Sequence, residues 1–77
     1  MSNYNKFVEV LEKNFLGASI DNVTDDEIID TLHENGLSCT LRRSKYYTSL
    51  DEYEIDIKEA GAYIAFIFDG DKCIDIY

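Results

Sequence analysis

The sequence predicts an α+β fold in which two N-terminal helices pack on one face of a three- or four-stranded antiparallel sheet. The first observation is a change in hydrophobic period, from spacings of three and four before residue 36 to alternation from Leu37 onward. The second is the order of the elements, helices first and strands afterwards, which favours a layered sandwich. The third is the length of 77 residues, which predicts one domain over residues 1–77.

The first helix is predicted over about residues 3–16. Ser2 or Asn3 can cap its start, and Gly17 suits a left-handed ending. Lysines balance glutamates along it, so we expect a structural role. Its apolar residues share one face: Tyr4, Phe7, Val8, Leu11 and Phe15.

The second helix follows a short connector at residues 18–23, and both of its ends are specified. Thr24 and Glu27 form a capping box, and Asn35–Gly36 followed by Leu37 predicts a Schellman ending. At 100° per residue, the buried stripe consists of Ile28, Ile29 and Leu32. The opposite face is acidic and consists of Asp26, Glu27, Asp30 and Glu34.

The second half of the chain alternates as strands do. A first strand is predicted from Leu37 to Arg42, and residues 42–49 then form a turn or a long hairpin arm. The clearest alternation follows at residues 52–57. Its inward side chains are Tyr53, Ile55 and Ile57, and its outward side chains are Glu52, Glu54 and Asp56.

The run at residues 62–68 is apolar on both sides, as a central strand is. Asp69–Gly70 then predicts a hairpin into a last strand that turns Ile74 and Ile76 inward. The helices can cover one side of the central strand, and the other side lacks cover within the chain. Because a domain of this size is marginally stable alone, we expect a homodimer through Tyr63, Ala65, Ile67 and Tyr77.

The charge of the chain is its outlying property, with 7 Lys and Arg residues against 16 Asp and Glu residues, a net charge of −9. This balance disfavours direct binding to nucleic acid or an anionic membrane and favours basic partners. The N-terminus lacks a hydrophobic signal core, and no apolar run approaches the ~18 residues of a membrane helix. We therefore expect a cytoplasmic protein with reduced thiols.

No residue set indicates catalysis, a cofactor or a metal site. His33 is the one histidine and is expected to be solvated on its helix. Cys39 and Cys73 do not form a Cys-x-x-Cys pair and are expected in the core or at an edge. Asp69–Asp71 with Asp75 lacks the ligand pattern of a calcium loop. We therefore expect a protein that is not an enzyme.

The acids fall into two blocks. Residues 21–34 carry six acids and no lysine or arginine, and residues 51–59 carry five acids and one lysine. Between the blocks lies a basic knot of Arg42, Arg43 and Lys45. The predicted partner-binding residues are Asp26, Glu27, Asp30, Glu34, Asp51, Glu52, Glu54, Asp56 and Glu59.

Two interpretations of the acidic blocks stay open. In the first, helix acids stabilise a helix N-terminus, strand acids protect a sheet edge from aggregation, and the whole surface keeps the protein dissolved. In the second, carboxylates on alternate strand residues repeat every ~6.6 Å, similar to the step between phosphates of a nucleic-acid strand. Such rows would imitate a phosphate backbone and be bound by a DNA-binding protein.

In its acidic composition and carboxylate rows, the chain resembles the small DNA-mimic inhibitors made by bacteriophages, and is similar in type to the phage inhibitor of the nucleoid protein HU. The resemblance implies a non-enzymatic, often dimeric protein of host takeover that blocks the DNA-binding surface of a basic host protein. The alternative is an immunity- or antitoxin-like protein that neutralises a basic nuclease or toxin, and a regulatory adaptor is a more distant one. The basic knot would pair with an acidic block across the dimer or form a solvated turn.

Overall fold

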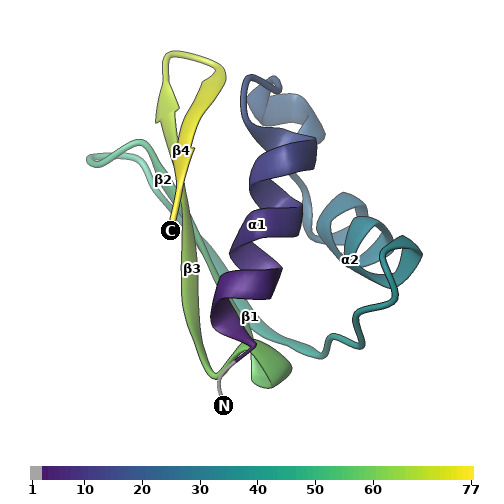
Figure 1. Cartoon of the computed structure of the whole chain (residues 1–77). Coiled ribbons are helices and arrows are strands. Elements are labelled where there is room, and N and C mark those ends of the chain that lie inside the picture. Colours follow the sequence, from purple (N-terminus) through teal and green to yellow (C-terminus); the bar gives the residue numbers. More distant parts are fainter. Residues whose placement is uncertain (1–2) are drawn as a thin grey trace.

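The computed structural model describes residues 3–77. The strands form one antiparallel sheet in the order β1-β2-β3-β4, and both α-helices lie on one side of it (Figure 1). The predicted α+β fold is therefore confirmed, with four strands. The elements in chain order are α1 (Tyr4–Phe15), η1 (Ile20–Asn22), α2 (Asp25–Glu34), β1 (Leu41–Tyr47), β2 (Glu52–Ile57), η2 (Lys58–Ala60), β3 (Ala62–Asp69) and β4 (Lys72–Ile76).

The hydrophobic core fills the space between the helix layer and the sheet. At its centre the ring of Phe66 makes edge contacts with Phe15 of α1 and Tyr53 of β2, with centroid distances of 6.0 Å in both cases. The inward side of β3 is therefore the side that the helices cover, as the alternation predicts. The side chains packed here include Phe7, Leu11, Ile28, Leu32, Ile55, Ile57, Ile64, Phe68 and Ile76.

The two helices differ in how their ends are fixed. The Thr24 hydroxyl accepts a hydrogen bond from the Glu27 N–H at 3.3 Å, and Leu37 N–H donates to the Leu32 carbonyl past Gly36, which has φ 77°. The Thr24 half of the predicted capping box and the Schellman ending of α2 are therefore confirmed. At the start of α1, Asn3 occupies the cap position but makes no side-chain cap bond. Ser2, the other predicted cap, lies outside the described residues.

The first strand begins later than predicted and contains the basic knot. Leu37 is buried and Cys39 is packed against the core, so their alternation reflects burial rather than strand pairing. The chain joins the sheet only after Thr40, whose carbonyl accepts a hydrogen bond from Lys58 N–H at 3.0 Å. A bulge in β1 between Leu41 and Arg43 follows directly.

The last strand differs from the prediction in one residue. A register shift in the β3–β4 pairing sets Phe68 opposite Cys73 and Ile67 opposite Asp75. Ile74 is the extra residue of this bulge and is 52 % exposed, whereas Cys73 is buried. The prediction that Ile74 faces inward is therefore wrong, because a bulge shifts the alternation by one position.

The segment between α1 and α2 is more than a connector, because it pairs with β4. Gly17 N–H donates to the Cys73 carbonyl at 2.8 Å, and Cys73 N–H donates to the Ala18 carbonyl at 2.9 Å. Further along the same edge, the Asp75 carboxylate accepts a hydrogen bond from Ile76 N–H at 2.9 Å. The free edge of β4 is thus closed to another strand along much of its length.

Candidate protein-binding surfaces

The first candidate surface is the outer side of α2, hereafter the α2 acidic face, which consists of Asp26, Glu27, Asp30 and Glu34. All four residues are exposed, and α2 contains no lysine or arginine. Residues four apart lie ~6 Å apart along a helix axis, so Asp26, Asp30 and Glu34 present one carboxylate per turn. Among residues 3–77 the one ion pair joins Arg42 to Asp56, so no cation of the described chain neutralises this row.

The buried side of α2 and its first residue hold this surface in place. Ile28 and Leu32 are 1 % and 0 % exposed. Asp25 is half-buried, and its Oδ2 accepts a hydrogen bond from the Ser44 hydroxyl of β1 at 2.9 Å. Asp25 therefore serves the fold, whereas the carboxylate of Asp26 beside it is exposed to solvent.

Two carboxylates of the α2 acidic face act against helix stability. Glu34 is the last residue of α2, where the negative end of the helix dipole disfavours another negative charge by about 0.3–1 kcal/mol. Asp30 and Glu34 are four residues apart and repel each other by a few tenths of a kcal/mol. The helix dipole, which explains acids at the start of α2, therefore does not explain this pair.

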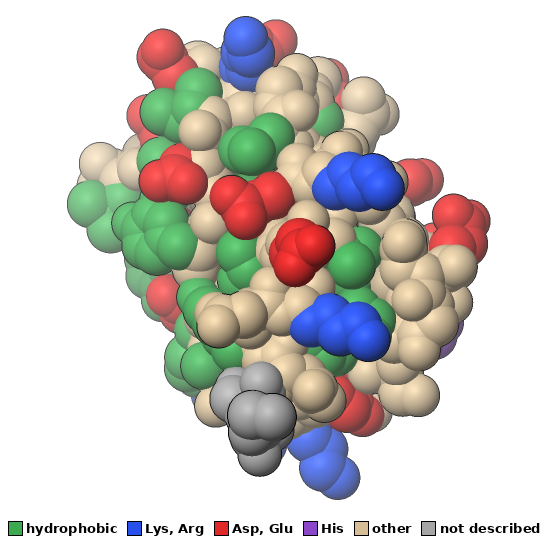
Figure 2. Space-filling view, in the orientation of Figure 1, with side chains coloured by type: hydrophobic (Ala, Val, Ile, Leu, Met, Phe, Trp, Pro, Cys, Tyr) green, Lys and Arg blue, Asp and Glu red, His purple; other side chains and the backbone are tan. Residues whose placement is uncertain are grey.

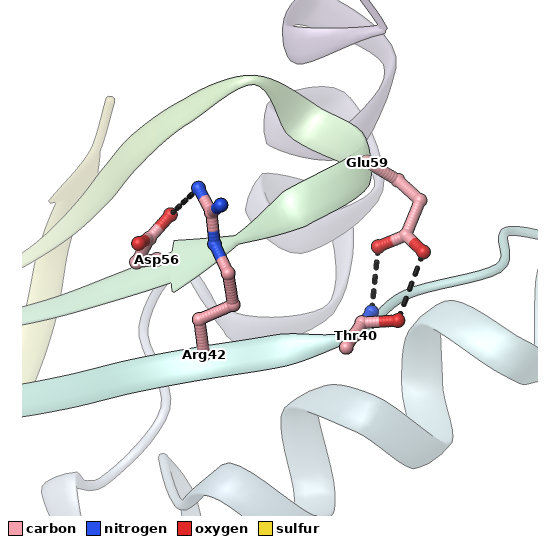
Figure 3. A network of polar contacts seen from close by, with 4 residues as sticks. All are labelled: Thr40, Arg42, Asp56 and Glu59. Atoms are coloured by element: carbon pink, nitrogen blue, oxygen red, sulfur yellow. Dashed lines mark hydrogen bonds and ion pairs between the residues drawn. The ribbon is translucent and has the colours of Figure 1, made fainter.

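The second candidate surface is the β2 acidic row, Glu52, Glu54 and Asp56, on the sheet face that the helices leave open. These residues are half-buried, and the Asp56 side chain is only 14 % exposed. Arg42 Nη2 donates to Asp56 Oδ1 at 3.0 Å (Figure 3). The residues directly opposite the row on β1 are Tyr47, Lys45 and Arg43.

The basic knot therefore lies in a strand, and the turn interpretation is wrong. Arg42 pairs within its own chain, with Asp56. Lys45 Nζ lies 4.8 Å from the centroid of the Tyr47 ring, a cation–π contact. The cations of β1 thus offset the negative charge of the neighbouring β2 acidic row.

The edge-protection explanation of the β2 acidic row is also wrong. β2 lies between β1 and β3, so it is an interior strand. The edge strands are β1 and β4, and β1 carries the three cations and a bulge. Charged side chains and bulges at an edge both discourage pairing with another chain, so the basic knot performs the role that the acids were expected to have.

Two further predicted binding residues serve the fold. The Glu59 carboxylate accepts hydrogen bonds from the Thr40 N–H at 2.6 Å and the Thr40 hydroxyl at 3.0 Å (Figure 3). The bond from the Thr40 backbone is the main cause that lowers the pKa of Glu59 below its ordinary value. Asp51 accepts a hydrogen bond from the Tyr46 hydroxyl at 3.3 Å, and its carbonyl accepts one from Phe68 N–H. Glu59 therefore joins η2 to the segment before β1, and Asp51 joins the turn after β1 to β3.

The fold does not bring the two acidic surfaces together. α2 belongs to the helix layer, and the β2 acidic row faces away from that layer on the far side of the sheet (Figure 1). A basic surface that covers one row would have to wrap round a molecule about 20 Å across to reach the other. The two rows are therefore separate candidate sites.

The four residues predicted for a dimer interface do share one face, hereafter the open sheet face, together with the β2 acidic row and the outward residues of β1. Ala65 and Tyr77 exchange two backbone hydrogen bonds, at 2.6 and 2.9 Å. Tyr63 and Tyr77 are 45 % and 55 % exposed. Figure 2 shows hydrophobic side chains gathered on the left, over the sheet. Sequence reasoning missed the exposed Ile74, because no residue type marks its bulge.

The chain has one histidine and two cysteines, the side chains weighed above for catalysis. His33 is exposed on α2. Cys39 and Cys73 are free thiols, and burial raises the pKa of each, which lowers the fraction of reactive thiolate. Within residues 3–77 no three metal-ligating side chains come together. No helix in that range has the length and apolarity that a membrane crossing requires.

Comparison of the chain with protein-family models, with curated proteins and with solved structures finds no match. What the protein does is therefore inferred from its own side chains and their placement.

Proposed function

We propose that the protein is a non-enzymatic acidic inhibitor that binds the DNA-binding surface of a basic protein. In this proposal the α2 acidic face takes the place of a phosphate backbone. The observation that carries it is a row of exposed carboxylates, one per helical turn, with no neutralising cation in the described chain. In line with the resemblance to phage-made inhibitors, the target is a nucleoid-type protein in the bacterial cytoplasm.

The spacing of the row supports this role. Asp26, Asp30 and Glu34 repeat every ~6 Å along α2, close to the step between neighbouring phosphates. Lysine and arginine side chains that are placed to meet successive phosphates could therefore meet these carboxylates one by one. Such binding is fast and weakens steeply as salt concentration rises.

The energetic cost of the row supports it as well. Glu34 at the end of α2 and its repulsion with Asp30 both lower the stability of the helix. Residues that oppose the stability of the fold are expected where function requires them. The β2 acidic row contributes less in this proposal, because Arg42 and its neighbours on β1 offset its charge.

The test compares two variants of equal net charge. In the first, Asp26→Lys, Asp30→Lys and Glu34→Lys reverse the α2 acidic face. In the second, Glu9→Lys, Asp21→Lys and Asp71→Lys reverse exposed acids elsewhere. Each immobilised protein is exposed to bacterial lysate and eluted with salt, and the eluted proteins are tested for duplex DNA binding with and without free wild-type protein.

We expect the wild type and the second variant to retain DNA-binding proteins and displace DNA from them, and the first variant to lose at least tenfold in affinity. Equal losses of affinity in both variants would show that net charge, and not the α2 acidic face, causes the binding. Capture of one nuclease or toxin, inhibited without regard to DNA, would favour the immunity-like alternative. Circular dichroism checks that each variant is folded.

A further inference from the structure

The two faces of the sheet differ, because the helices pack on one of them and leave the open sheet face without a covering layer. The helices cover only the inward side chains of the strands. On the other side the exposed apolar side chains include Tyr63, Ile74 and Tyr77, at 45 %, 52 % and 55 %. Ala65 and Ile67 lie between them on β3, where neighbouring side chains leave Ala65 8 % exposed and Ile67 half-buried.

The charges of this face are arranged in stripes of opposite sign. β1 carries a positive stripe, β2 a negative stripe of three acids, and β3 from Tyr63 to Ile67 has no charge. The three cations of β1 equal the three acids of β2, and Asp75 of β4 adds one acid, whereas the chain as a whole has a net charge of −9. The open sheet face is thus the part of the surface through which two copies can approach without strong repulsion.

We propose that the open sheet face binds a second copy of this chain in a two-fold dimer. A half-turn about an axis parallel to the strands, between β2 and β3, places β1 of one copy over β4 of the other. The register then sets Lys45 against Tyr77 of the second copy, and Tyr47 against Asp75 of the second copy. A cation meets an aromatic ring, and a hydroxyl meets a carboxylate, on both sides of the axis.

In the same arrangement the two inner strands also match. β2 lies over β3 of the second copy, so the aliphatic stems of the β2 glutamates pack on the apolar stripe. Asp56 keeps its bond to Arg42 of its own chain, so its charge enters the interface already paired. Stacked sheets lie ~10 Å apart, with their strands crossing at about 30°. The side chains of both faces fill the space between them.

The area and the edges of the sheet favour a face-to-face dimer. Four strands ~4.8 Å apart with about six residues each form a face of roughly 20 by 20 Å. Both copies together would bury on the order of 1,000 Å², the lower limit of a specific interface. Pairing at the β4 edge is opposed by Gly17, Ala18 and the Asp75 carboxylate, which occupy its backbone groups.

The dimer goes beyond the proposed function and does not depend on it, because the α2 acidic face lies in the other layer of the molecule. With the sheets in contact, the two α2 acidic faces would point outward on opposite sides. One dimer could then bind two basic partners, or two sites of one partner, with the gain in avidity that linked sites give.

The test measures mass by light scattering from about 5 to 500 μM, a range suited to an interface of this size. We expect the mass to rise from 8.9 kDa toward twice that value. Ala65→Lys places a charge at the centre of the face, yet in the monomer it lies opposite Glu54 and can pair with it. We expect at least tenfold weaker dimerisation. Asn14→Lys, on the exposed side of α1, is the matched control and should leave the dimer unchanged.

Tyr77→Ser is a second variant that removes an exposed ring and retains the backbone pairing with Ala65. We expect about tenfold weaker dimerisation from it as well. In amide NMR spectra, dilution should shift the resonances of the outward residues of the sheet and leave the resonances of α2 unchanged. A wild type that stays monomeric throughout, a dimer that ignores both sheet variants, or dilution shifts confined to α2 would each overturn the dimer.

Loss of one-to-one binding to a basic partner in the Ala65→Lys variant would overturn it too, because the face would then belong to that partner. Failure of the α2 charge-reversal variant to lose its partner affects the proposed function alone. The two proposals therefore fail in different measurements.

Discussion

The α2 acidic face and the β2 acidic row contain the same kind of side chain and have opposite surroundings. On α2 the carboxylates are exposed and meet no cation of the described chain. On β2 they are half-buried and lie opposite Arg43, Lys45 and Tyr47, and Asp56 is bound by Arg42. A run of acids in a sequence therefore does not predict how negative the folded surface will be. Strand register decides which of the carboxylates lie beside cations.

The largest effect should come from removing the cation that the β2 acidic row depends on. Arg42→Ala leaves the carboxylate of Asp56, which is 14 % exposed, without its ion pair. We expect a loss of about 1–2 kcal/mol in the free energy of unfolding, measured by urea denaturation at low salt. Lys6→Ala, at an exposed position of α1, is the control and should change it by less than about 0.5 kcal/mol. Equal effects would show that the row is not neutralised locally.

The next effect concerns the cap that positions the α2 acidic face. Thr24→Ala removes the acceptor of the Glu27 N–H, and we expect a loss of about 1 kcal/mol. Thr24→Ser keeps the hydroxyl and should recover most of it. If both variants unfold at the same urea concentration as the wild type, then burial of Ile28 and Leu32 alone fixes the helix.

Neutralising one acid in each row should change the stability of the protein in opposite directions. Glu34→Gln removes a negative charge from the C-terminal end of α2 and should stabilise the protein by about 0.3–1 kcal/mol. Asp56→Asn removes a negative charge from β2 and should destabilise it, because Arg42 loses its ionic partner. Two losses, or two gains, would contradict the distinction between an uncompensated and a compensated row.

The smallest effect is a pH dependence at Glu59. Hydrogen bonds from Thr40 lower the pKa of this carboxyl below its ordinary value of 4.5. Its stabilising contribution is therefore complete above that value and is lost as the pH falls through the folded pKa. In Glu59→Gln, the urea midpoint should fall less steeply between neutral and acid pH than in the wild type. Identical slopes would mean that the bond to Thr40 does not persist in solution.

The sequence predicts the order of elements, the ends of α2 and the two sides of β3, because these depend on local rules. The cap at Thr24 and the left-handed Gly36 are set by nearest neighbours along the chain. The alternation of β3 fixes which side chains share the open sheet face. The bulges at Arg42 and Ile74 depend on contacts with other strands, and no residue type announces them.

The candidate site was predictable in part for the same reason. The α2 acidic face follows from helical periodicity alone. The fate of the β2 acidic row depended on the position of the basic knot. The sequence left a turn, a hairpin arm and pairing across a dimer open for it, and the fold places it in the edge strand β1. Glu59 and Asp51 look like the other acids in the sequence and are distinguished only by Thr40 and Tyr46, which the fold brings to them.

The pairing of Gly17 and Ala18 with Cys73 has a consequence for how fast the chain folds. These hydrogen bonds join stretches far apart in sequence, so the intervening loop must close before they contribute any energy. Chains rich in such distant pairings fold more slowly than helical bundles of equal length. The time the protein needs to reach its native state should therefore be set by the search for this late contact, while its helices form and dissolve many times over.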